Sequence, residues 1–129
     1  MLVVDASVIA PVVADAGPDG VRFRQRLHSE QVAAPDLLRV EVVSVIRRQL
    51  HFGNLDVTQA EQAVTDLLDL PITVYPTAPL LLRCWQLRDN LTAYDACYIA
   101  LAETLGSSLL SADARLSRAP GTRCALETI

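Results

Sequence analysis

Short apolar segments alternate with helical segments along the whole chain, and this alternation is the strongest constraint on its fold. The segments 2–5 (LVVD), 31–35 (QVAAP), 72–75 (ITVY) and 107–113 (SSLLSAD) have the pattern of short buried strands, with a possible fifth strand at 122–128 (TRCALET). Alternation of this kind produces a parallel sheet with helices on both faces. The sequence therefore predicts an α/β fold, a three-layer α/β/α sandwich around a mostly parallel sheet of four or five strands.

The expected helices follow the strands in turn. They cover residues 7–15, 18–29, 36–52, 58–69, 76–88 and 91–106, and a single turn follows at 112–120. Asp36 is expected to open the helix at 36–52, and Thr58 to cap the next one. The helix at 36–52 is apolar on nearly all sides, so we expect it to pack on two faces, with Val42, Val43 and Ile46 supporting a partner surface.

Size and charge exclude several classes of protein. A chain of 129 residues is expected to form a single domain over residues 1–129. No apolar run reaches the roughly 18 residues of a membrane span, and the N-terminus lacks a basic signal segment, so a cytoplasmic protein is expected. A net charge of −4 has the wrong sign for binding nucleic acid through bulk positive charge. Three scattered cysteines without a CxxC pair predict reduced packing residues, not a disulfide framework or a thiolate zinc site.

Four acids interrupt apolar segments: Asp5 in LVVDASVIA, Glu41 in RVEVVSVI, Asp95 in TAYDACYIALA and Asp113 in SLLSADARL. In an open parallel sheet the ligand crevice lies outside the carboxyl ends of the strands, where Asp5 and Asp113 are expected. If all four carboxylates converge there, they repel one another unless a cation lies between them. The chain contains no lysine, and oxygen ligands without histidine or cysteine favour Mg²⁺ or Mn²⁺ over zinc.

Each acid also has a purely structural interpretation. Asp5 and Asp113 are both placed to cap the helical segment that follows, and Thr92-x-x-Asp95 has the spacing of a capping box. Glu41 lies several residues inside its expected helix, where it cannot act as a cap; the arginine seven residues later is a possible ion-pair partner. Taken singly, each aspartate is more easily explained as a cap than as a ligand.

Together these motifs resemble a known family. VVDASVIA, the acid at residue 41, AYDACYIALA and LLSADARL resemble the PIN domain, and specifically the VapC toxins of bacterial toxin–antitoxin pairs, over essentially the whole chain. The resemblance implies a PIN-like fold and an Mg²⁺- or Mn²⁺-dependent ribonuclease. It also implies a homodimer that a small VapB-like antitoxin holds inactive. Carried onto matching positions, it makes Asp5, Glu41, Asp95 and Asp113 the metal ligands and catalytic acids, and Ser7, Ser111 and Arg115 weaker candidates for substrate contact.

The predicted mechanism is metal-assisted hydrolysis of RNA, with arginines of 22–26 or of 115–118 on the phosphates. A PIN-like interaction module without catalytic activity is the main alternative. A receiver-type signalling domain and a DxD phosphatase both need a lysine that this chain lacks. A metal-free mechanism through His28 and His51 is disfavoured, because both are explained by expected positions at helix ends.

Overall fold

The computed structural model describes residues 1–129 and contains a five-stranded sheet in which every pair of neighbouring strands is parallel. The strands are β1 (Leu2–Val4), β2 (Val32–Pro35), β3 (Ile72–Tyr75), β4 (Leu109–Ser111) and β5 (Leu126–Thr128). Their order across the sheet is β3-β2-β1-β4-β5. The predicted α/β class and all five expected strands are confirmed.

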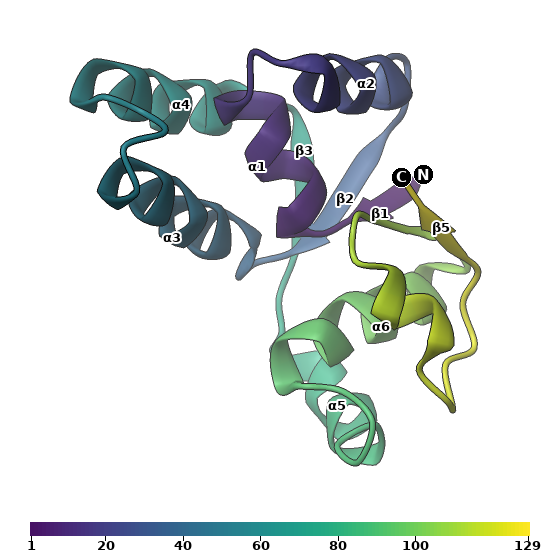
Figure 1. The fold of residues 1–129 in the computed structure, drawn as a ribbon. Coiled ribbons are helices and arrows are strands. Elements are labelled where there is room, and N and C mark those ends of the chain that lie inside the picture. The colour runs from purple at the N-terminus through teal and green to yellow at the C-terminus, as the bar shows by residue number, and fades with distance from the viewer.

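Helices cover both faces of this sheet and give the predicted three layers (Figure 1). One layer contains α1 (Ala6–Ala14), α2 (Pro18–Leu27), α3 (Leu38–His51) and α4 (Val57–Asp69). The other contains α5 (Leu81–Gln86) and α6 (Ala93–Leu105), and short 3₁₀ turns η1 (Ala78–Leu80) and η2 (Ala114–Arg118) precede α5 and follow β4. In the first layer α1 packs against α2, α3 and α4; in the second, α6 packs against β1, β2, β4 and α5.

The strand order reverses direction at β1. The chain adds β2 and β3 on one side of β1 and then returns to add β4 and β5 on the other side. In open α/β sheets a crevice forms at such a reversal, outside the carboxyl ends of the two strands concerned. Asp5 directly follows β1 and Asp113 lies two residues after β4, so both stand at this edge as expected.

The core is almost entirely apolar. Of 33 buried residues only Asp5 and Ser111 are polar or charged, and both lie at the strand-order reversal. Helix α6 is buried from Ala96 to Ala102, because it is held between the sheet and α5. No helix combines the length and the apolar character that a membrane span requires.

Helix α3 differs from the prediction in two respects. It begins at Leu38, and its N-cap residue is Leu37, which makes no side-chain cap bond, so Asp36 does not open the helix. Val42 and Ile46 are buried in the protein's own core, and only Val43 is exposed. The predicted partner surface is therefore wrong for Val42 and Ile46, because α1 and α4 both pack on this helix.

Helix α4 has a different cap from the one expected. Its N-cap is Asp56, not Thr58. The Asp56 carboxylate accepts the Gln59 backbone N–H at 2.8 Å, and the Gln59 side chain accepts the Asp56 N–H at 2.9 Å. This reciprocal pair satisfies two backbone donors at the helix start, so it prevails over a single threonine cap two residues later.

Candidate functional site

Asp5 is a buried carboxylate at the start of α1, only 7% exposed. Its Oδ1 accepts the backbone N–H of Ser7 at 3.1 Å and the Ser7 hydroxyl, while its Oδ2 accepts the Ser111 hydroxyl at 2.6 Å. The predicted N-cap role is confirmed. A bond to Ser111, more than a hundred residues away in the chain, shows that Asp5 is more than a cap.

The two serines connect the start of α1 to the end of β4. The Ser7 hydroxyl oxygen accepts the Ala112 N–H at 2.9 Å, and the Ser111 oxygen accepts the Asp113 N–H at 3.0 Å. The two hydroxyl oxygens lie 3.3 Å apart. Both serines thus hold Asp5 and the chain after β4 in place, and their predicted contact with substrate stays a prediction.

Glu41 lies in the first turn of α3 and is held from the opposite layer by α6. The Tyr98 hydroxyl donates to Glu41 Oε1 at 2.6 Å, and the Tyr98 ring is 2% exposed. Glu41 is the fourth residue of α3 and does not cap it, as predicted, and it makes no ion pair with Arg48. Sequence analysis missed Tyr98; the available signal was a tyrosine in a helix that is otherwise apolar there, since a buried tyrosine hydroxyl needs a partner.

Asp95 lies in the first turn of α6, which Thr92 caps by accepting the Asp95 backbone N–H at 3.2 Å. No bond returns from the Asp95 carboxylate to the Thr92 backbone, so the predicted capping box is only half formed. The side chain of Asp95 is therefore not needed as a cap.

Asp113 caps η2 by accepting the Arg115 backbone N–H at 3.0 Å, as predicted. The Arg115 guanidinium also binds this carboxylate, with Nη2 at 2.7 Å from Oδ2 and Nε at 3.0 Å from Oδ1. Arg115 holds the pKa of Asp113 below its ordinary value. The Arg115 side chain is 81% exposed, so this ion pair can exchange with solvent or with another anion.

The other three acids have raised pKa values. For Asp5, Glu41 and Asp95 alike, burial is the main cause, because it disfavours the charged form. The charge of Asp95 further raises the pKa of both Asp5 and Glu41, and the charge of Asp113 raises the pKa of Asp95. The four predicted residues therefore form one electrostatically connected group at the strand-order reversal.

The donor set suits a hard divalent cation. No three His, Cys, Asp or Glu side chains are close enough in this structure to hold a metal ion. Glu41 has one carboxylate oxygen that accepts no hydrogen bond, and the raised pKa values of Asp5, Glu41 and Asp95 mean that their ionised forms would be stabilised by a nearby positive charge. Oxygen-only ligands of this kind match Mg²⁺ and Mn²⁺.

Two cavities open beside the acids. One, of about 460 Å³, is lined by Asp95 and Asp113 together with Arg115 and Arg118. The other, of about 430 Å³, lies between α1 and α3 and is lined by residues that include Ser7, Glu41, Ser44 and Arg48. Each of the two cavities is therefore lined by at least one of the acids and at least one arginine.

The arginines of α2 are used within the protein. Arg24 donates to the carbonyl oxygens of Val12 and Asp15, and Arg26 forms a two-bond ion pair with Glu127. None of the α2 arginines lines the two cavities beside the acids. Arg48, which sequence analysis considered only as a partner for Glu41, does line one of them.

Comparisons with known proteins agree with this geometry. The family model described as "PIN domain" matches residues 2–121. Ribonuclease VapC1 of Mycobacterium tuberculosis is 38% identical over 128 residues, which are 98% of this chain and 96% of the relative. The crystal structure of Mycobacterium tuberculosis VapC20, a sarcin–ricin loop cleaving toxin, superposes with a TM-score of 0.72 at 17% identity, covering 95% of this chain and 97% of the other. VapBC2 from Rickettsia felis, bound to a promoter DNA fragment, gives a TM-score of 0.70 at 11% identity, over 99% and 98% of the two chains.

The raised pKa of Asp95 predicts that this acid lowers stability at neutral pH. The pKa of Asp95 is higher in the folded state than its ordinary value of 3.8. Its contribution to stability is therefore fully present below about pH 3.8. That contribution is lost as the pH rises through the pKa of the folded state. Asp95→Asn is therefore expected to raise the thermal unfolding midpoint at pH 7 by roughly 2–4 °C, and the difference should shrink as pH falls to about 4.

Asp89→Asn is the matched control, because Asp89 is exposed and forms no ion pair. Its midpoint should stay at the wild-type value. A midpoint for Asp95→Asn at or below that of the wild type at pH 7, measured by circular dichroism, would contradict the electrostatic interpretation.

Proposed function

Since this chain belongs to the PIN domain family, and within it to the VapC ribonucleases, we propose that it is the ribonuclease toxin of a toxin–antitoxin pair. The observation that carries the proposal is the group of carboxylates at the strand-order reversal, three of which have raised pKa values. Such a group has little structural use, because it disfavours folding at neutral pH. It is suited to binding a cation beside a phosphodiester.

We propose that Asp5 and Asp95 hold an Mg²⁺ or Mn²⁺ ion, and that Glu41 holds it through a water molecule. The acids would have to move closer together than they lie in this structure, and Asp113 would join them when Arg115 releases it. The bound cation would neutralise charge on the phosphoryl oxygens and make an attacking water more acidic. Ser7 and Ser111 orient Asp5, and their hydrogen bonds lower its pKa against the larger opposing effect of burial. Arg115 and Arg118 line the adjoining cavity, where a phosphate of the RNA can replace Asp113 as the partner of Arg115.

Glu41 has the geometry of a group that accepts a proton. Tyr98 fixes its Oε1, which leaves Oε2 available to accept a proton from the attacking water. Burial raises the pKa of Glu41, so its carboxylate is a stronger base than an exposed glutamate. Tyr98 acts here as a positioning residue, since it holds Glu41 and does not line the cavity.

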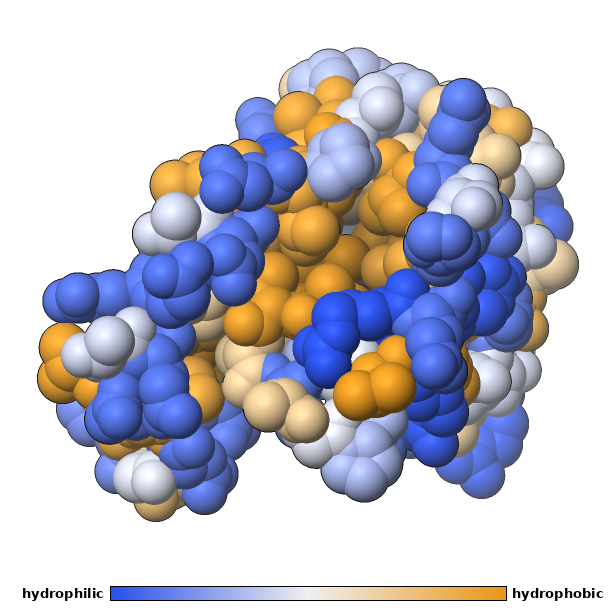
Figure 2. Space-filling view, turned by 90° about the horizontal axis from the view of Figure 1, so that it is seen from above, coloured by the Kyte–Doolittle hydropathy of each residue, from blue (hydrophilic) through white to orange (hydrophobic).

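An apolar groove offers a site for the antitoxin. It runs along α1 between α2 and α4, and Figure 2 shows an apolar hollow between two polar flanks on this side of the molecule. Its two parts have volumes of about 290 and 620 Å³, and its apolar residues include Val12, Val13, Leu27, Leu55 and Ile72. We propose that an apolar segment of a small VapB-like antitoxin packs here, with a basic residue reaching the acids.

A second exposed apolar surface, on α5, suits the proposed homodimer. Leu81, Leu82 and Trp85 are 54%, 83% and 67% exposed, and they share one short helix. Clustered apolar side chains of this size on a protein surface mark interaction sites. The dimer surface is therefore proposed on α5, in place of the buried residues of α3 that the sequence suggested.

Cleavage of single-stranded RNA is expected to require Mg²⁺ or Mn²⁺ and to stop in EDTA. Mn²⁺ should also raise the unfolding midpoint of the wild type, because it binds only the folded state, and Asp5→Asn should reduce both effects. Gel analysis of labelled RNA and thermal unfolding test this, with Asp89→Asn as the control. Cleavage undiminished in EDTA would rule out the cation.

Tyr98→Phe is expected to slow cleavage roughly tenfold, because it removes the donor to Glu41 Oε1. The Tyr98 bond lowers the pKa of Glu41, so its loss should move the acidic limb of the pH–rate profile to higher pH. Tyr94→Phe, in the same helix at a 63% exposed position, is the control. An unshifted acidic limb in Tyr98→Phe would show that Glu41 is not the proton acceptor.

Leu82→Glu is expected to convert the dimer to a monomer in sedimentation velocity, because it places a charge in the proposed apolar contact. Leu68→Glu changes a 67% exposed leucine on α4 and should leave the dimer intact. A wild type that sediments as a monomer, or a dimer unaffected by Leu82→Glu, would refute this surface.

A further inference from the structure

We propose that the cleft between α1 and α3 binds one nucleotide of the RNA beside the scissile phosphate, with Arg48 on its phosphate and the amides of Gln49 and Asn54 on its base. The inference rests on the proposed ribonuclease function and assigns it a subsite. We call this feature the α1–α3 cleft. Its residues are Ala6, Ser7, Ala10, Pro11, Ala14, Asp15, Glu41, Ser44, Val45, Arg48, Gln49, Asn54 and Leu55.

The α1–α3 cleft is continuous from the acids to the turn between α3 and α4. Its inner part is the cavity of about 430 Å³ that includes Ser7, Glu41 and Arg48. Its outer part, of about 310 Å³, shares Ala10, Pro11 and Val45 with the inner part and ends at Asn54 and Leu55. A chain cleaved at Glu41 can therefore extend along this path without leaving the surface. The volumes lie in the range of small-molecule pockets, about 300–1,000 Å³.

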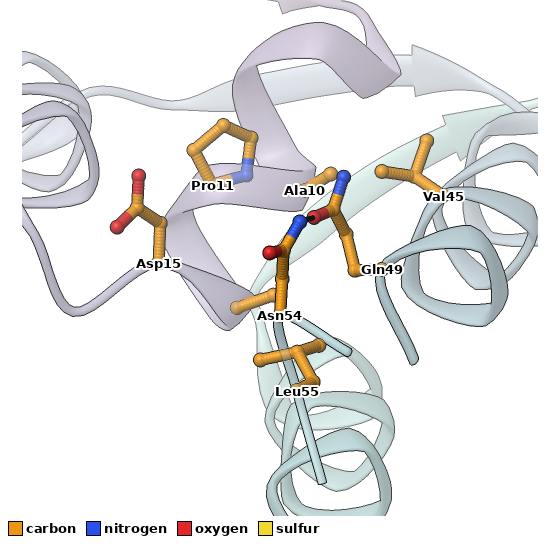
Figure 3. Close-up of a pocket in the computed structure, with 8 residues that line it drawn as sticks. Ala10, Pro11, Asp15, Val45, Gln49, Asn54 and Leu55 are labelled. Carbon is orange, nitrogen blue, oxygen red and sulfur yellow. Dashed lines mark hydrogen bonds between the residues drawn. The ribbon is translucent and has the colours of Figure 1, made fainter. Parts of the chain in front are cut away.

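The outer part combines apolar walls with hydrogen-bonding groups at one end. Figure 3 shows Pro11 of α1 across the pocket from Val45 and Gln49 of α3, with Asn54 beside Gln49 and Asp15, the residue after α1, at the edge of the pocket. The Asn54 amide donates from Nδ2 to Gln49 Oε1 at 2.7 Å. This bond leaves the Gln49 amide nitrogen as a donor and the Asn54 Oδ1 as an acceptor. A neighbouring donor and acceptor are what the edge of a nucleobase requires, and apolar walls suit its faces.

The turn after α3 fixes this amide pair before any ligand binds. The backbone N–H groups of Asn54 and Leu55 both donate to the Gln49 carbonyl oxygen, at 2.9 and 3.4 Å. Gly53 adopts a φ of +79°, a left-handed conformation that glycine enters without strain. The turn that carries the pair is thus held by backbone bonds, which lowers the conformational entropy that the protein would lose when a base binds.

The charges along the α1–α3 cleft set the direction of the nucleotide. Arg48 is exposed, forms no ion pair and lines the inner part, next to the acids. Asp15 lies at the outer end, where its Oδ1 accepts the Gly17 N–H at 2.7 Å. A phosphate is attracted by Arg48 at the inner end, where the proposed cation would offset the charge of Glu41, and is repelled by Asp15 at the outer end. The cleft therefore holds a phosphate near Arg48 and a base beyond it, and has no place for a second phosphate.

The phosphate contact is tested by RNA binding, which does not depend on cleavage. The probe is a short fluorescein-labelled single-stranded RNA of randomised sequence, with Ca²⁺ as the cation, and the readout is fluorescence anisotropy. Arg48→Ala should weaken RNA binding roughly fivefold to tenfold. It should also reduce the salt slope, which is the slope of log Kd against log salt concentration, by about 1, because one phosphate contact is lost. Arg47→Ala removes the neighbouring exposed arginine, which does not line the α1–α3 cleft, and should change neither value.

The base contact is tested by sequencing the RNA that the protein retains from the same randomised pool. The wild type should enrich a preferred base at one position roughly tenfold, and Gln49→Ala should remove that preference while leaving the salt slope unchanged. Gln31→Ala, at an exposed position outside the α1–α3 cleft, should keep the wild-type preference. Unfolding midpoints of all four variants are measured alongside, so that a folding defect is recognised.

The outcomes separate this inference from the ribonuclease proposal. The α1–α3 cleft is not the subsite if Arg48→Ala and Arg47→Ala weaken RNA binding equally. It is also not the subsite if the base preference survives Gln49→Ala. Both conclusions hold even if the wild type cleaves RNA. Failure of the wild type to bind the probe overturns it as well. Binding with the expected dependence on Arg48 and Gln49, but no cleavage in Mn²⁺, supports the subsite and rejects the ribonuclease activity.

Discussion

The burial of Asp5 is the constraint on which the rest of the site depends. A carboxylate that is 7% exposed is tolerated only if hydrogen bonds replace the water it has lost. Ser7 supplies two of these bonds from the first turn of α1, and Ser111 supplies the third from the end of β4. Because the serine oxygens also accept backbone N–H groups of Ala112 and Asp113, the same network sets the path of the chain after β4. The two central strands are thus joined at their carboxyl ends through one acid, and the position of Asp113 follows from it.

The four acids are treated differently by their surroundings, and the differences correspond to separate roles. Asp5, Glu41 and Asp95 are partly or fully buried and have raised pKa values, so each gains from a nearby cation. Asp113 already has a cation in Arg115, and its pKa is lowered. The first three form a group that lacks positive charge, while the fourth is held at its edge by an exposed, exchangeable ion pair. Stability alone would favour neutral residues at the first three positions, which is why function is the better explanation of them.

The sequence predicted the architecture because it depends on local patterns. Strand and helix alternation fixes a parallel sheet, and Asp5 and Asp113 follow apolar strands that end at one edge of it. The failures concern contacts between distant segments. Tyr98 binds Glu41 across the interface of α6 and α3, and no sequence spacing relates the two. The sequence predicted that Val42 and Ile46 belong to an apolar surface open to a partner. In the structure α1 and α4 pack on α3, and both residues are buried. Caps were predicted well when one residue acts alone, as at Asp5, and less well where reciprocal bonds compete, as at Asp56.

A protein with a net charge of −4 that acts on RNA must place its few positive groups where the polyanion passes. All its basic residues other than histidine are arginines, whose charge is permanent and whose guanidinium can bind a phosphate through two bonds. Those of α2 are engaged by carbonyl groups and by Glu127, whereas Arg48 has no ion-pair partner and Arg115 has an exchangeable one. They line the two cavities that adjoin the acids. Glu41 lines one of these cavities and Asp95 the other, so a strand of RNA that contacts both arginines would lie beside both acids. In the proposed function, the placement of the arginines, and not the total charge, brings the scissile bond to the acids.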